Sequence, residues 1–181
     1  MTQRRINNVT IECTLGDIAN QADMDAVVNA ANAQLRPGGG VAGAIHRAAG
    51  PGLDEECRPL APIKPGQAVI TGAHNLPNKY VIHCLGPVYG VDEPSDQLLA
   101  NCYRQALQLA EQNGIESIAF PAISTGVFGY PLEAATGIAL GVMADEAQTL
   151  TKLKQIRCVL FQPSDLAVYN QILDELIAAR E

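Results

Sequence analysis

The stretch DAVVNAANAQLRPGGGVAGAIHRAAG, residues 25–50, contains the features on which the fold prediction depends. It opens with a short, continuous apolar run at residues 25–31, which is typical of a strand covered on both faces. Three consecutive glycines follow at residues 38–40. Apolar residues then recur at helical spacing until Gly50 and Pro51 end the run. This stretch predicts a buried strand, a glycine loop and a helix, in that order.

The alternation of strands and helices continues along the chain. Residues 9–15 alternate apolar and polar side chains, the period of a half-exposed strand. Further strands are predicted within residues 67–73, 79–87, 117–123 and 156–162, and further helices within residues 97–113, 131–150 and 169–177. We expect one α/β/α layered domain over residues 1–181, with a mainly parallel sheet.

Composition excludes several classes of protein. A chain of 181 residues with 48% hydrophobic residues is large and apolar enough to bury a real core. Its net charge of −7 argues against nucleic-acid binding, which relies on clustered Lys and Arg. A phosphate group would therefore have to be bound locally, by the backbone.

Neither a secretory signal nor a membrane-spanning run is visible, so we expect a cytoplasmic protein without a membrane partner. The five cysteines are scattered and odd in number, which disfavours a disulfide framework or a zinc site. We expect most of them to be small core residues.

Gly38, Gly40 and Gly43 form a literal G-x-G-x-x-G, which raises the alternative of an NAD-linked oxidoreductase. The context does not fit that alternative. A dinucleotide fingerprint follows its strand at once and has an acidic residue about 20 positions later. Here the predicted strand ends near Ala30, and PLAPIK, residues 59–64, contains no acid.

A second glycine-bearing loop, residues 121–131, also lies between a predicted buried strand and a helix start. Both loops should emerge at the carboxyl edge of the sheet, where open α/β sheets bind ligands. Backbone N–H groups and helix N-termini bind anions without any Lys. The two loops therefore predict a diphosphate site, with tight structural connections as the alternative.

Three polar residues need an explanation near these loops. Asn29 and Asn32 lie at the end of a buried strand, where a ligand or a turn must satisfy their side chains. Asp17 could act as a helix N-cap before Ile18.

Five segments together carry a resemblance to a known family. They are LGDI (15–18), VVNAAN (27–32), GGGVAGAIH (38–46), NLPNKYVIH (75–83) and PAISTGVFGYP (121–131). In this order and spacing the chain resembles the macrodomain family, in particular its branch of O-acetyl-ADP-ribose deacetylases and mono-ADP-ribosyl hydrolases. The resemblance implies a three-layer α/β/α sandwich around a mixed, mainly parallel six-stranded sheet, and binding of ADP-ribose.

The resemblance also implies roles for individual residues. Asp17 would accept a hydrogen bond from the adenine amino group, Ile18 would add a backbone contact, and Phe161 would lie against the adenine. Asn32 would bond the distal ribose, with Asn29 beside it in the substrate site. The phosphates would lie between two runs of backbone: Ser124, Thr125, Gly126, Val127 and Phe128 on one side, and Gly38, Gly39, Gly40 and Val41 on the other.

The implied activity is hydrolysis of ADP-ribosyl esters, either on Asp or Glu side chains of modified proteins or in O-acetyl-ADP-ribose. Asn32, Phe128 and Gly40 would form the catalytic surroundings of a water molecule, without a metal or other cofactor and in a monomer. One residue departs from the pattern. Ala42 stands where hydrolases of this branch usually have an Asp. The alternative is therefore a module that binds ADP-ribose without turnover.

Overall fold

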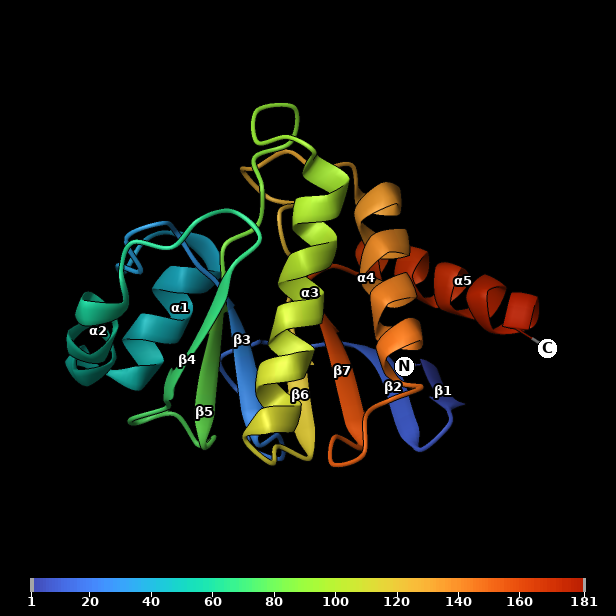
Figure 1. Ribbon diagram of the computed structural model, residues 1–181, viewed down its shortest axis with the longest axis horizontal. Coiled ribbons are helices and arrows are strands. Elements are labelled where there is room, and N and C mark those ends of the chain that lie inside the picture. The colour runs from blue at the N-terminus through green and yellow to red at the C-terminus, as the bar shows by residue number, and fades with distance from the viewer. Residues whose placement is uncertain (1, 181) are drawn as a thin grey trace.

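A computed structural model describes residues 2–180 of the chain, and its centre is one seven-stranded sheet. The strand order is β1-β2-β7-β6-β3-β5-β4. The strands are β1 (Thr2–Ile6), β2 (Val9–Leu15), β3 (Ala26–Ala30), β4 (Ala68–Gly72), β5 (Tyr80–Cys84), β6 (Ser117–Phe120) and β7 (Gln155–Leu160). Figure 1 shows them side by side in this order.

The five inner strands are parallel, and the two edge strands are antiparallel to their neighbours. The central strands β3, β6 and β5 are mostly apolar because both of their faces are covered, whereas β2 alternates apolar and polar residues. Their carboxyl ends meet at a single edge of the sheet, which is the upper edge in Figure 1. Every loop that follows an inner strand begins at this edge.

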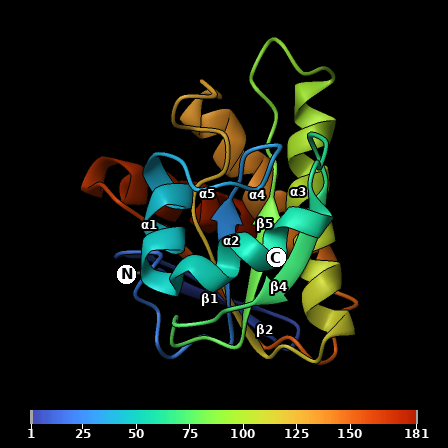
Figure 2. The same ribbon diagram turned by 90° about the vertical axis from the view of Figure 1, so that its left-hand side faces the viewer.

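Helices cover both faces of the sheet. They are α1 (Gly40–Ala49), α2 (Pro51–Cys57), α3 (Ser95–Gln112), α4 (Leu132–Glu146) and α5 (Pro163–Arg180). The buried residues of α3, α4 and α5 pack in one apolar cluster, and those of α1 and α2 pack in another on the opposite face. Figure 2 shows α1 and α2 across the sheet from α3. The predicted three-layer α/β/α fold is confirmed.

All five cysteines are buried, as the sequence analysis expected. Burial raises the pKa of Cys57 to about 11 and that of Cys102 to about 12, so neither is a thiolate at neutral pH. Within residues 2–180, no helix combines the length and apolar character needed to cross a membrane.

Three details differ from the prediction. The sheet has seven strands rather than six, because β1 is an exposed edge strand of sequence TQRRI without an apolar alternation. Gly50 ends α1 but also begins α2, since its positive φ of 84° turns the chain and Pro51 fits the first helical turn. The helix that follows Pro131 ends at Glu146, earlier than predicted.

Candidate functional site

Strand pairing explains how distant segments meet at the upper edge of the sheet. Leu15 pairs with Leu160, so Asp17 and Phe161 follow neighbouring strand ends. The Gly16 amide donates to the Leu160 carbonyl over 3.0 Å and ties these two ends together. In the same way, β3 leads into the first glycine loop and β6 into the second. The topological position is the one at which open α/β sheets bind ligands.

A cleft with two lobes lies between these loops. The Asp17 lobe has a volume of about 420 Å³ and is lined by Gly16, Asp17, Ile18, Gly40, Val41, Ala44, Pro121, Ala122, Thr125, Gly126, Val159, Leu160, Phe161 and Asp165. The Phe128 lobe has a volume of about 530 Å³ and is lined by Ala30, Ala31, Gly39, Gly40, Val41, Gly86, Ala122, Ile123, Ser124, Gly126, Val127 and Phe128. Gly40, Val41, Ala122 and Gly126 line both lobes and form the waist between them.

The glycines around the cleft fall into two groups. A Cβ on Gly43 would collide with the Gly38 carbonyl, so this glycine is required by packing of α1 against the loop before it. Gly86 is required in the same way, because a Cβ there would collide with the Ser124 hydroxyl. By contrast, a Cβ on Gly39 or Gly126 would meet no protein atom within 4 Å and would project into open space.

Backbone amides at the waist are available to a ligand. Gly39 is the N-cap of α1, and the first main-chain bond of this helix is donated by Gly43 to the Gly39 carbonyl. The amides of residues 40–42 are therefore free of helical partners. In the second loop the Gly129 and Tyr130 amides bond within the loop, whereas those of Ser124 to Phe128 have no protein acceptor among the described residues.

Side-chain charge in the cleft is negative rather than positive. Among the described lining residues there is no Lys or Arg, while Asp17 and Asp165 are both present. An anion bound at the waist would thus be held by amides and by the positive end of α1. Ser124 has a positive φ of 68°, and its hydroxyl donates to the Pro87 carbonyl over 2.9 Å. Its amide, not its hydroxyl, is the group left for a ligand.

Most of the predicted site residues line this cleft, but Asn29, Asn32 and Gly38 are not among its lining residues. The Asn32 amide nitrogen donates to the Arg36 carbonyl over 2.8 Å, and its oxygen accepts from the Arg36 amide over 3.0 Å. These bonds close the loop that leads to the glycines. A carboxamide has two N–H groups and two lone pairs, so each end of Asn32 keeps one position for another bond.

Asn29 is buried in the protein interior and is not among the residues that line the cleft. Its side chain is 1% exposed, and its nitrogen lies 3.1 Å from His83 Nδ1. Burial lowers the pKa of His83 to about 3, so this imidazole is neutral at pH 7 and can accept that bond. His83 Nε2 lies 2.9 Å from the Thr71 hydroxyl. The nitrogen of Asn29 thus has a partner 54 positions away, whereas its oxygen Oδ1 is buried and has no hydrogen-bond partner among the described residues.

Asp17 caps a turn rather than a helix. One oxygen of its carboxylate, Oδ1, accepts from the Ala19 amide over 2.9 Å, and its carbonyl accepts from the Asn20 amide over 2.9 Å. The Phe161 side chain is 87% exposed at the other wall of the same lobe. An acceptor and an exposed aromatic ring in one lobe suit a flat, hydrogen-bonding group.

An ion-pair network lies beneath the turn at Asp17. Arg157, on β7, contacts the carboxylate of Glu12 on β2 and makes two bonds to Asp23 of 2.8 and 2.7 Å. The hydrogen bond to Asp23 is the main cause that raises the pKa of Arg157, and the same bond lowers the pKa of Asp23. The Glu12 and Arg157 side chains are only 3% and 14% exposed. The guanidinium is therefore fixed in a known orientation.

Sequence reasoning missed several lining positions, among them Gly86, Ala122 and the charged Asp165. Gly86 and Ala122 lie near the carboxyl ends of the predicted strands 79–87 and 117–123, and follow the observed β5 and β6, so their position at this edge of the sheet was a usable signal. Within residues 2–180, no group of three or more His, Cys, Asp or Glu side chains is arranged to hold a metal ion.

Comparison with known proteins agrees with this geometry. The family model described as Macro domain matches residues 28–139. A protein of Cronobacter sakazakii named O-acetyl-ADP-ribose deacetylase is 44% identical over 176 residues, which cover 94% of each chain. The ADP-ribose glycohydrolase MACROD2 of Xenopus laevis is 46% identical over 163 residues, which are 88% of this chain but 39% of that protein.

A solved structure agrees over almost the whole chain. The Oceanobacillus iheyensis macrodomain, determined with ADP, superposes with a TM-score of 0.94 at 38% identity and covers 98% of this chain and 97% of its own. A variant of the same macrodomain was determined with ADP-ribose.

Proposed function

Because this chain belongs to the Macro domain family, we propose that its cleft binds ADP-ribose and that the protein hydrolyses ADP-ribosyl esters. The substrates would be proteins modified on Asp or Glu side chains, or O-acetyl-ADP-ribose. In this proposal adenine occupies the Asp17 lobe, the diphosphate lies at the waist, and the distal ribose occupies the Phe128 lobe.

The observation that carries the proposal is glycine at positions where the protein itself does not need it. A Cβ on Gly39 or Gly126 would meet no protein atom within 4 Å, and both glycines line the cleft. Glycine at such a site is explained when a ligand approaches the backbone closely. Free amides are present in both loops that line the waist, and in this proposal they donate to the diphosphate.

Binding through amides also suits the charge of the protein. A chain with a net charge of −7 cannot attract a nucleotide by its overall field. Several N–H groups aimed at one anion provide a local attraction that Asp17 and Asp165 do not cancel, because those carboxylates lie in the lobe assigned to adenine. The relatives named for ADP-ribose chemistry support this assignment of the ligand.

Hydrolysis of the ester adds one water across the bond between the ribose and the acyl group, and yields ADP-ribose and a free carboxylate. The cleft would contribute by holding the ribose against Phe128 and by fixing the phosphates next to the attacking water. Positioning and charge stabilisation of this kind are large catalytic effects in themselves. Asn32, with one free position at each end of its amide, would orient the ribose.

Ala42 supports a second candidate function, an ADP-ribose-binding module without turnover. Its side chain is a methyl group, 5% exposed in the first turn of α1, and offers no general base. Loss of general-base assistance slows a reaction by a factor of roughly 10² to 10⁴. A slow hydrolase and a pure binding module therefore have to be separated by experiment.

The decisive experiment measures ADP-ribose released from a glutamate-modified protein and from O-acetyl-ADP-ribose. We expect release by the wild type and at least a tenfold loss in Asn32→Ala, an estimate for a lost positioning group. Equal background rates in both proteins would refute the hydrolase and leave the binding module. In Ala42→Asp we expect an equal or faster rate, and a loss of activity there would contradict our interpretation of the loop.

Calorimetry with ADP-ribose and NAD tests the ligand itself. We expect ADP-ribose to bind more tightly than NAD to the wild type. Tight binding of NAD with weak binding of ADP-ribose would contradict the proposed function and favour the dinucleotide alternative.

A further inference from the structure

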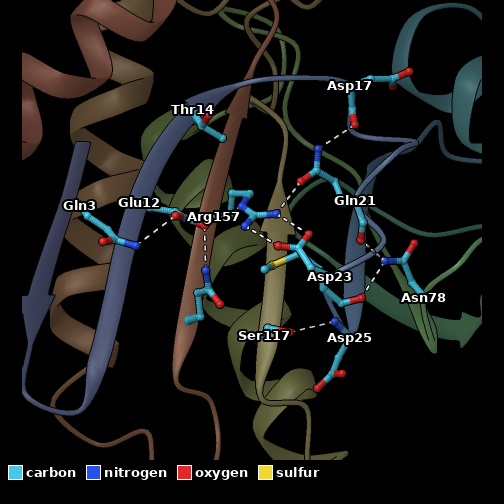
Figure 3. Close-up of polar contacts among 12 residues, drawn as sticks. Gln3, Glu12, Thr14, Asp17, Gln21, Asp23, Asp25, Asn78, Ser117 and Arg157 are labelled. Atoms are coloured by element: carbon cyan, nitrogen blue, oxygen red, sulfur yellow. Dashed lines mark hydrogen bonds and ion pairs between the residues drawn. The ribbon is translucent and has the colours of Figure 1, made fainter. Parts of the chain in front are cut away.

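The turn that carries Asp17 is supported by the buried side chain of Gln21. This residue is 7% exposed and lies between the turn and the sheet. Its Nε2 donates to the Asp17 carbonyl over 2.8 Å, and its Oε1 accepts from Arg157 Nη1 over 2.9 Å. Figure 3 shows this chain of contacts from Arg157 through Gln21 to Asp17.

The chemistry of Arg157 fixes which way the Gln21 amide points. A guanidinium has only donors, so the group that faces it must be the oxygen of the amide. Arg157 itself cannot turn away, because Glu12 accepts from its Nε and Asp23 accepts from both Nη1 and Nη2. The nitrogen of Gln21 is therefore directed at the Asp17 carbonyl, and its N–H group is the right partner for that acceptor.

The surroundings of Gln21 leave it little freedom. The nitrogen of Asn78 donates to the Gln21 and Met24 carbonyls over 2.7 Å each, which fixes the backbone of this segment. A Cβ added to Gly16 would lie 3.3 Å from Gln21 Nε2, so the backbone just before Asp17 rests directly on the amide. The position of the turn and the position of Gln21 are thus coupled.

We propose that Gln21, oriented by Arg157, is a positioning residue that selects adenine through Asp17. The inference rests on the proposed function, which assigns the Asp17 lobe to the base. With its carbonyl held by Gln21 and one carboxylate oxygen held by Ala19, Asp17 keeps its second oxygen for the exocyclic amino group of adenine. Hypoxanthine has a carbonyl at that place and would face the carboxylate with like polarity.

Gln21→Glu is the sharpest test, since it replaces the donor by an oxygen of the same size and adds one negative charge next to Arg157. The variant keeps an acceptor for Arg157 and should fold, but it turns a second oxygen toward the Asp17 carbonyl. We would measure affinities for ADP-ribose and for inosine diphosphate ribose by calorimetry. We expect the ratio of the two affinities to fall about tenfold from that of the wild type, the scale of one charge-assisted hydrogen bond.

Gln112→Glu is the matched control. This exposed residue ends α3 at the edge of the sheet opposite the cleft, and the same chemical change there should leave both affinities unchanged. A urea titration of each variant measures its free energy of unfolding and shows whether the substitution destabilises the fold. If Gln21 had only a structural role, Gln21→Glu would lower the affinities for both ligands in parallel and leave the ratio of the two affinities unchanged.

A double substitution checks that Gln21 acts through Asp17. In an Asp17→Ala background, Gln21→Glu should cause no further change in the ratio, because the acceptor that it positions is gone. The proposal is overturned if Gln21→Glu keeps the wild-type ratio, or if it lowers the ratio equally in both backgrounds. A wild type that binds neither nucleotide would instead overturn the proposed function, and this inference with it.

Discussion

Gly126→Val tests the role of the waist of the cleft. Gly126 lines both lobes, and a Cβ there would meet no protein atom within 4 Å. Its φ lies outside the left-handed region, so a side chain causes no backbone strain. We therefore expect the free energy of unfolding to change by no more than about 0.5 kcal/mol, as at other exposed sites.

Binding should respond very differently. Three added carbons at the waist would occupy the space of the diphosphate and separate it from the amides of both loops. Loss of two charge-assisted hydrogen bonds, at roughly 1.5 kcal/mol each, corresponds to an affinity for ADP-ribose lowered about 100-fold. Calorimetry measures the affinity, and a thermal melt measures the stability.

Gly137→Ala provides the control for replacing a glycine. Gly137 is exposed within α4, and its Cβ would also meet open space. Alanine in a helix stabilises by about 1 kcal/mol relative to glycine, so this variant should melt at a higher temperature and bind ADP-ribose unchanged. An unaltered affinity in Gly126→Val, with stability retained, would refute the placement of the diphosphate at the waist.

Three further predictions concern charge, pH and the adenine lobe. Arg157→Met leaves the buried carboxylate of Glu12 unpaired, so the free energy of unfolding from urea titration should fall by about 3 kcal/mol; no loss would contradict the buried ion pair. Burial acts to raise the pKa of Glu111, but bonds from the Thr151 hydroxyl and from the amides of residues 151–153 outweigh it and lower the pKa from 4.5 to about 2. Glu111→Gln should therefore lower the free energy of unfolding by roughly 1 to 2 kcal/mol at pH 7. Thermal melts should show this difference between variant and wild type disappear as the pH falls from 4.5 to 2. A difference that grows in acid would contradict a lowered pKa of Glu111. Phe161→Ala should leave the melting temperature unchanged and lower the affinity for ADP-ribose about tenfold, because stacking on a base is lost. The affinity for ribose 5-phosphate, which has no base, should stay the same. An equal loss of affinity for both ligands would exclude a role of Phe161 at the adenine.

Most of the fold could be predicted because its inner strands and helices are apolar in a regular pattern. Six strands followed from continuous or alternating apolar runs, and the glycine loops followed from the residues between them. The strand at Thr2–Ile6 could not be predicted, because TQRRI is held by pairing with Val9–Leu15 and buries little of its own surface. The residues that hold this strand in place are those of its partner, Val9–Leu15, and not its own.

The site was predictable where it depends on the backbone and less so where it depends on side-chain partners. Glycine and strand ends placed the two loops correctly at one edge of the sheet. The partner of Asn29 could not be read from the sequence, since His83 is brought to it only by the pairing of β3 with β5. The contact of Gln21 with Arg157 joins residues 136 positions apart, and no local pattern marks either of them.

The most direct test of the central claim is an amide NMR titration of the labelled protein with ADP-ribose. We predict that the largest shift changes fall on the backbone N–H groups of residues 39–42 and 124–128, because these groups would donate to the diphosphate. Saturable binding with those amides unchanged, and with the shifts concentrated on another face, would contradict the claim that bare main-chain donors hold the ligand.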